Sequence, residues 1–175
     1  MSAPSLAELE FLPVLDADGL MPDTFDGKVG VYAIFDAAKI LQYVGYSRDV
    51  SLSLKQHLVR QPQSCYWFKV QTIDRPSRSI LEATRDAWIG ENGAVPLGNA
   101  AAADLWNQPI DAKPRMTTAE QTAYESSDEP GKIKALKQVA RRIEIEVMQD
   151  LEARGVKLPI RFDPKAKESG LLNLK

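Results

Sequence analysis

The sequence predicts a mixed α/β (α+β) domain, a small three-stranded antiparallel sheet flanked by helices, with a helical extension after it. Two short stretches rich in β-forming residues, 29–35 and 41–45, are separated by a loop of hairpin length. A third alternating stretch, 64–73, lies between two segments with helical apolar spacing. The predicted order is therefore strand, strand, helix, strand, helix, a β-β-α-β-α arrangement.

The predicted hairpin places two tyrosines on neighbouring strands. Tyr32 lies two residues after Gly30, and Tyr43 lies two residues before Gly45. Residues 51–60 then predict a helix, because their leucines recur at helical spacing. We expect this helix to pack on the hairpin that precedes it.

The third strand and the second helix follow the same reasoning. In residues 64–73 alternate side chains point to opposite faces, and Phe68 belongs to the predicted core face. Asp74 is suited to cap a helix that we expect from about residue 75 to residue 89, with Leu81 turned inward.

The longest helical pattern comes near the end of the chain. Apolar residues from Ile133 to Leu151 recur at spacings of three and four, and Gly155 follows the pattern. We divide the chain into an N-terminal arm packed on the domain (1–28), the α+β domain (29–100), a connector (101–127), the long helix with a short extended segment (128–163) and a mobile tail (164–175). The alternative for the tail is that Leu171, Leu172 and Leu174 dock.

The composition is that of an ordinary globular protein, with 44% hydrophobic and 26% charged residues and a net charge of −2. This balance excludes a strongly basic protein that coats nucleic acid, so any such contact must come from a local patch. The longest apolar run, 29–35, is too short to span a membrane. The lone cysteine, Cys65, excludes an internal disulfide and predicts a reducing, cytoplasmic location. One cysteine and one histidine also exclude a Cys/His zinc cluster.

Several short motifs occur in a meaningful order along residues 29–99. They are Gly30-Val31-Tyr32, Tyr43-Val44-Gly45, an Ile-Leu-Glu segment that ends at Glu82, and then Pro96 and Asn99. This series resembles the GIY-YIG endonuclease superfamily domain, over less than half of the chain. The phrase YVG-x-SR-x-V is similar to cyanobacterial GIY-YIG-like proteins and to the domain that precedes a plastid monothiol glutaredoxin.

The resemblance implies hydrolysis of a DNA phosphodiester with one divalent cation, Mg²⁺ or Mn²⁺. It implies that Glu82 is the metal ligand, that Tyr32 and Tyr43 lie near the attacking water, and that His57 lies on the phosphate side. Such a set is chemically sensible, because a hard cation prefers carboxylate oxygen and polarises a bound water. Gly30, Gly45 and Asn99 would organise the site.

The chain departs from the family at one position. The family's helix arginine, eight residues after the second glycine, is replaced here by Ser53. Either Arg48, three residues after Gly45, takes over the contact with the phosphate, or the site has lost catalysis and keeps only binding. Lys55 is a weaker substitute.

Other basic residues are candidates for nucleic-acid contact. Besides Lys55 these are Lys69 on the third strand and Lys134, Lys137 and Arg141 on the long helix. Bases in the first half of a helix oppose its dipole, and a bound anion would explain them. The alternative is a solvated face with ion pairs such as Arg142 to Glu146.

The sequence leaves three functions open. The first is a metal-dependent endonuclease that nicks DNA, and the second is a non-catalytic nucleic-acid- or protein-binding module of the same fold. The third, an interaction domain with a redox partner such as a glutaredoxin, follows from the resemblance alone. In the structural alternative, Tyr32 and Tyr43 are a cross-strand pair and Glu82 is a surface residue paired with Arg78.

Overall fold

The computed structural model describes residues 3–175, which form two compact units. The first ends at Asn107 and the second runs from Gln108 to Lys175. Along the first unit the elements are η1 (Leu6–Glu8), β1 (Leu12–Pro13), β2 (Gly30–Phe35), β3 (Leu41–Ser47), α1 (Val50–Arg60), β4 (Trp67–Thr72), α2 (Arg78–Asn92), η2 (Leu97–Asn99) and α3 (Ala103–Asn107). The α+β class and the predicted order of strands and helices are confirmed.

The sheet has four strands in the order β1-β4-β2-β3, all antiparallel, so the prediction of three strands is wrong. The additional strand is β1, in which Leu12 and Pro13 pair with Phe68 and Trp67. Two residues are too few to show an alternating pattern, and a proline is tolerated only at the edge of a sheet. The arm of residues 1–28 therefore contributes to the sheet itself.

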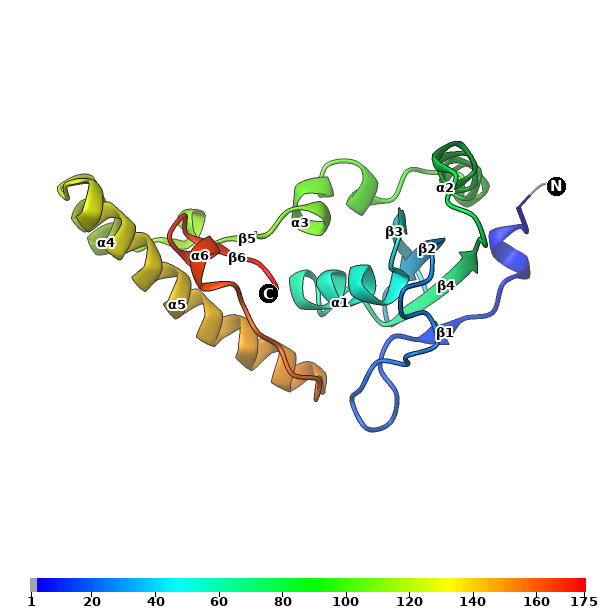
Figure 1. Ribbon diagram of the computed structural model, residues 1–175, viewed down its shortest axis with the longest axis horizontal. Helices are drawn as coiled ribbons and strands as arrows, with labels where there is room; N and C mark the ends of the chain where they lie inside the picture. The colour runs from blue at the N-terminus through cyan, green and yellow to red at the C-terminus, as the bar shows by residue number, and fades with distance from the viewer. Residues whose placement is uncertain (1–2) are drawn as a thin grey trace. The chain divides into compact units, whose positions relative to one another are not determined.

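The two faces of the sheet carry different helices (Figure 1). Val31, Ala33 and Val44 pack against Leu81 and Trp88 of α2. Because side chains alternate along a strand, their neighbours on β2 and β3 point to the other face, which α1 covers. On that face Tyr32 lies opposite Gly45 in the strand register.

The arm is fastened to the α2 side by hydrogen bonds. The Glu91 carboxylate accepts from the backbone N–H groups of Leu6 and Ala7, and the Trp88 indole donates to the Pro4 carbonyl. Lys69 is buried beneath the arm and donates to the Leu6 carbonyl at 2.9 Å. These contacts cover the polar ends of η1.

The second unit contains β5 (Ile110–Asp111), η3 (Lys113–Arg115), α4 (Thr118–Glu125), α5 (Glu129–Arg154), α6 (Pro164–Lys167) and β6 (Leu171–Leu172). The long helix is confirmed as α5, capped by Asp128 and ended by Gly155 in the left-handed conformation. Its buried stripe includes Leu136, Ile143 and Leu151. Within residues 3–175, no helix is long and apolar enough to cross a membrane.

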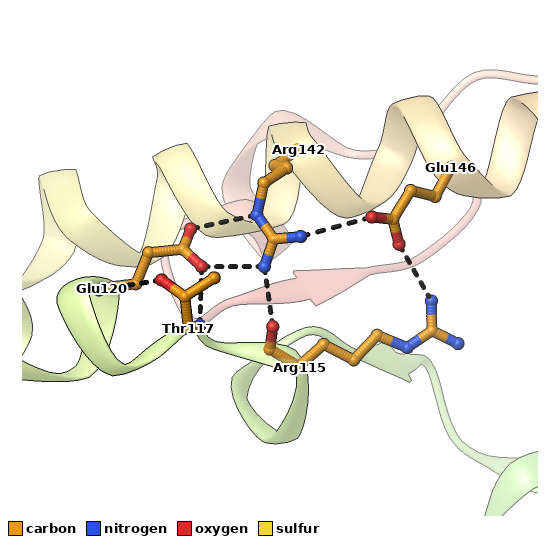
Figure 2. Close-up of polar contacts among 5 residues, drawn as sticks. All are labelled: Arg115, Thr117, Glu120, Arg142 and Glu146. Atoms are coloured by element: carbon orange, nitrogen blue, oxygen red, sulfur yellow. Dashed lines mark hydrogen bonds and ion pairs between the residues drawn. The ribbon is translucent and has the colours of Figure 1, made fainter.

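A charged network joins α4 to α5 (Figure 2). The Arg142 guanidinium donates to both oxygens of Glu120, at 2.8 and 3.1 Å, and to the Arg115 carbonyl at 2.7 Å. Glu120 also completes a capping box with Thr117. Arg142 thus fixes the start of α4 against the middle of α5.

The last residues of the chain contain α6 and β6, and the buried Leu172 shows the docking that was the alternative to a mobile tail. Leu171 and Leu172 pair with Asp111 and Ile110 of β5, and Leu172 is fully buried. Three leucines in a polar segment carry no clear periodicity, and the strand that receives them lies about sixty residues earlier in the chain. The connector likewise divides at Asn107, since α3 belongs to the first unit.

Candidate functional site

Three residues predicted for the site meet on the α1 face of the sheet. The Tyr32 hydroxyl lies 2.8 Å from His57 Nε2, and the ring centroids of Tyr32 and Tyr43 are 6.1 Å apart. The rings of Tyr43 and His57 are 4.6 Å apart. Residues that are distant in the sequence therefore form one contact group.

This group is closed by α3. The Trp106 indole stacks flat on Tyr43 at 5.3 Å, and the Tyr43 hydroxyl donates to Asn107 Oδ1 at 2.6 Å. The Arg60 guanidinium holds the segment through the Trp106 carbonyl. We call Tyr32, Tyr43, His57 and Trp106 the aromatic–histidine cluster, and each member is buried. Sequence reasoning did not place Trp106 in the site, because nothing local in a helix of five residues indicates its partner.

The cluster is neutral at physiological pH. Burial, together with the charge of Arg60, lowers the pKa of His57 to about 3, and the Trp106 carbonyl offsets this only in part. Among residues 3–175 the buried His57 Nδ1 makes no hydrogen bond of acceptable geometry. Burial, with the nearby Tyr43, raises the pKa of Tyr32 well above its usual value. Tyr32 is thus a phenol that can donate to an unprotonated imidazole.

The glycines and Asn99 shape the site through the backbone. A side chain on Gly45 would meet the Tyr32 hydroxyl and the Tyr43 ring within 3 Å, and one on Gly30 would meet the Gln71 carbonyl at 2.6 Å. The Asn99 amide accepts from Val44 N–H at 2.8 Å and donates to Val44 C=O at 2.7 Å. Gly45 and Asn99 thus act on the part of β3 that carries Tyr43, whereas Gly30 allows the close approach of β4, and none of the three offers a reactive group.

Glu82 is held on the α2 face of β3, which is the face opposite the aromatic–histidine cluster. Its Oε1 accepts from the Tyr46 hydroxyl at 3.1 Å and from Arg78 at 2.7 Å, and these contacts, Arg78 first, lower the pKa of the carboxyl. Tyr46 belongs to the α2 face, because it alternates with Gly45 along β3. The carboxylate and the cluster are therefore not joined by a direct hydrogen bond within the described residues. Among the described residues, the second carboxylate oxygen, Glu82 Oε2, accepts no hydrogen bond.

Arg85 is a residue that the sequence reasoning missed. Its guanidinium lies over the Tyr46 ring at 5.4 Å and contacts Asp86 at 3.0 Å. Its charge helps to lower the pKa of Glu82, after the hydrogen bonds of Arg78 and Tyr46, and opposes the burial that raises the pKa of Tyr43. The signal available was its position, one helical turn after Glu82.

The residues weighed as substitutes for the family arginine have different surroundings. Ser53 donates to Ser47 Oγ at 2.7 Å and contributes to the surroundings of the Tyr32 hydroxyl, so its position on α1 does face the cluster. Arg48 is exposed in the turn before α1, and Lys55 is half-buried on α1. Neither cation has a salt-bridge partner among residues 3–175.

A divalent cation would find one protein ligand here. Within the described part of the chain, no group of three His, Cys, Asp or Glu side chains could hold a metal. The uncommitted Glu82 Oε2 fits the mode in which Mg²⁺ is bound by one carboxylate, waters and substrate phosphate. A cation bound through Glu82 would therefore take its remaining ligands from water and from a substrate phosphate.

The basic residues predicted to contact nucleic acid differ in their exposure. Lys69 does not lie on the surface, because its ammonium is buried among Phe11, Phe35 and the Leu6 carbonyl, and burial lowers its pKa. Its assignment as a surface contact was wrong, since alternation in a strand does not reveal what covers each face. Lys134 and Arg141 are exposed on α5, and Lys137 is half-buried and paired with Glu168 at 3.5 Å.

Comparison with known proteins shows a distant relative and no family assignment. No protein-family profile matches the chain. Over 99 residues it is 36% identical to the bifunctional monothiol glutaredoxin-S16, chloroplastic, of Arabidopsis thaliana. The alignment covers 54% of this chain and 32% of that protein, so the chain spans about a third of the relative's length.

Proposed function

We propose that the first unit is a GIY-YIG-type nuclease domain that hydrolyses DNA phosphodiesters with Mg²⁺ or Mn²⁺. The observation that carries this proposal is the Glu82 carboxylate, which has one oxygen committed to Tyr46 and Arg78 and the other without a partner among the described residues. Glu82 is paired with Arg78 and feels the charge of Arg85, and it bonds to Tyr46 of β3, the strand that also carries Tyr43. The order of the motifs along residues 29–99 adds support.

The chemistry assigned to each residue follows from its surroundings. Arg85 and Arg78 supply positive charge that neutralises a phosphate, and Glu82 Oε2 holds the cation. A bound Mg²⁺ or Mn²⁺ would polarise a water and offset the phosphate charge. On the α1 face, neutral His57 accepts the proton of the Tyr32 hydroxyl and keeps that phenol oriented.

A plasmid-nicking assay tests the proposal. Wild-type protein is expected to nick supercoiled DNA with Mg²⁺ or Mn²⁺, and Glu82→Gln to lose about 100-fold or more of the rate. Glu10→Gln is the matched control, because Glu10 is an exposed acid of the arm. Nicking that survives Glu82→Gln indicates a contaminating nuclease and rejects the assignment.

A second pair of variants decides which cation serves the phosphate. Arg85→Gln and Arg48→Gln remove one charge each, from α2 and from the turn before α1. If Arg85 has taken over from the missing helix arginine, its variant is expected to lose roughly tenfold or more of the nicking rate while Arg48→Gln stays near wild type. The reverse result would return the role to Arg48.

The alternative is a binding module without catalysis. It is favoured by the closure of the aromatic–histidine cluster under Trp106 and by Ser53 at the arginine position. It predicts no nicking by the wild type with either cation, together with salt-dependent retention of DNA. Absence of retention at low salt would dismiss it.

We further propose that the protein works in a reducing compartment. The single cysteine favours a reducing compartment such as the cytoplasm, whereas the name of the relative gives a chloroplast location for that protein. The relative is also a glutaredoxin, and a link to such a partner predicts co-purification with one. No described residue of this chain argues for that link.

A further inference from the structure

The second unit carries a basic hollow that the nuclease proposal does not use. It has a volume of about 540 Å³ and is lined by Lys137, Arg141, Pro164, Lys165, Lys167 and Glu168. We call these six residues the basic pocket. Four cationic side chains and one carboxylate line it, in a chain whose net charge is −2.

Only part of this positive charge is compensated. Lys137 pairs with Glu168 at 3.5 Å, and Lys167 pairs with Glu144. Arg141 and Lys165 are exposed, and neither has a salt-bridge partner among residues 3–175. The pocket therefore presents two uncompensated cations at a concave surface, where an anion of matching size gains from both.

The two sides of the pocket are held in place by the fold. One side is α5 and the other is the α6 segment, which is fixed because Ala112 N–H donates to the Gly170 carbonyl and the Lys113 ammonium to the Ser169 carbonyl. Gly170 has φ +72°, and a side chain there would meet Leu136 at 3.2 Å. The cations of α6 are thus positioned by a folded segment.

The row of cations extends beyond the hollow. Lys134, Lys137 and Arg141 are spaced by three and four residues, so they share one face of α5. Seven residues of helix span about 10 Å, and charges along one nucleic-acid strand are roughly 3.4 Å apart along the axis. A length of about 10 Å covers roughly three such intervals, so the row lies along several successive phosphates, which a single small anion does not supply.

We infer that the basic pocket and the adjacent Lys134 bind the phosphate backbone of a nucleic-acid strand, with Arg141 and Lys165 as the principal contacts. This inference rests on the proposed function for the choice of nucleic acid, and it adds a second contact region for the same substrate class. The pocket is lined by cations, a proline and the Glu168 carboxylate, which is paired with Lys137, and its lining holds no aromatic ring on which a base could stack. We therefore expect binding to be independent of sequence.

The test measures DNA binding in full-length protein that carries Glu82→Gln, so that cleavage does not interfere. Fluorescence anisotropy with a labelled single strand of about 20 nucleotides is followed between about 50 and 200 mM NaCl without divalent cations. Arg141→Gln with Lys165→Gln is expected to weaken binding at the lowest salt on the order of tenfold and to reduce the salt slope by about 1.4. Lys157→Gln with Arg161→Gln is the matched control, because it removes the same two charges from exposed positions of the second unit outside the pocket.

Equal salt slopes in the pocket variant and the control would overturn the inference. A second arm adds inorganic phosphate at constant ionic strength. Loss of phosphate binding in the pocket variant with unchanged DNA affinity would make this a small-anion site and reject the nucleic-acid assignment. If the pocket variant binds DNA more weakly but the wild type never nicks DNA, the nuclease proposal is rejected and the pocket inference stands. If the wild type nicks DNA but the pocket variant binds DNA as well as the control does, the pocket inference alone is rejected.

Discussion

The molecule contains two polar networks that differ in burial. The aromatic–histidine cluster in the first unit is buried and uncharged, with Tyr32 bonded to His57 at 2.8 Å. The network around Arg142 in the second unit is charged and half-exposed, with the Arg142 side chain 37% accessible. Removal of a contact from the buried network should lower the free energy of unfolding strongly, because no water replaces it. In the exposed network water can replace much of a lost hydrogen bond or ion pair, so the loss should be small.

The largest effect is expected at the cover of the buried cluster. Trp106→Ala removes the ring that stacks on Tyr43 at 5.3 Å and leaves a cavity, so the free energy of unfolding should fall by about 3–5 kcal/mol. Urea denaturation at about pH 8 measures this loss. Leu105→Ala, at an exposed position of the same helix, is the control. A loss below about 1 kcal/mol would show that α3 is not a packed part of the unit.

The next effect is a dependence of stability on pH. Because the pKa of His57 is about 3 in the folded chain, against 6.5 for an exposed histidine, the unfolded chain binds more protons between these values. Stability therefore falls as the pH drops below about 6.5, by about 2 kcal/mol at pH 5 relative to pH 8, and the fall ends near pH 3.

Urea denaturation at about pH 5 and about pH 8 checks this expectation against His57→Gln, which keeps a polar side chain that does not titrate. The variant should be less stable at the higher pH and should lose about 2 kcal/mol less than the wild type on acidification. An identical pH dependence in the two proteins would mean that His57 is not buried in its neutral form.

The smallest effect is expected in the exposed network. Arg142→Gln removes the two bonds to Glu120 and the bond to the Arg115 carbonyl. Hydrogen exchange of the α4 amides should accelerate by no more than about fivefold, and salt at about 1 M should shrink the difference. Global unfolding of the second unit by this variant would show that the comparison between the networks is wrong.

Sequence patterns predicted the elements that depend on interactions between residues close together in the chain. The hairpin that carries Tyr32 and Tyr43 was predicted from alternating residues and the length of its loop. Helix α5 was predicted from the spacing of its apolar residues and the glycine that ends it, and each of these signals lies within one short window of sequence. What escaped prediction depends on partners far away in the chain, such as the pairing of Leu172 with Ile110.

The site was predicted less completely than the fold. Alternation placed Lys69 on one face of β4, but only the structure shows that η1 covers that face. Glu82 was expected to converge with both tyrosines, and instead it bonds to Tyr46, a residue that the motif pattern leaves unmarked. Arg85 escaped notice although it follows Glu82 by one helical turn, because that spacing does not reveal the Tyr46 ring on which its guanidinium stacks.

The amide of Asn99 has a consequence for how the protein behaves in concentrated solution. It occupies the N–H and C=O of Val44 on the outermost strand, β3, much as a neighbouring strand would. An unprotected outer strand is a template on which another molecule can extend the sheet, and that is a route to aggregation. We therefore expect Asn99 to protect the protein from self-association at this edge of the sheet.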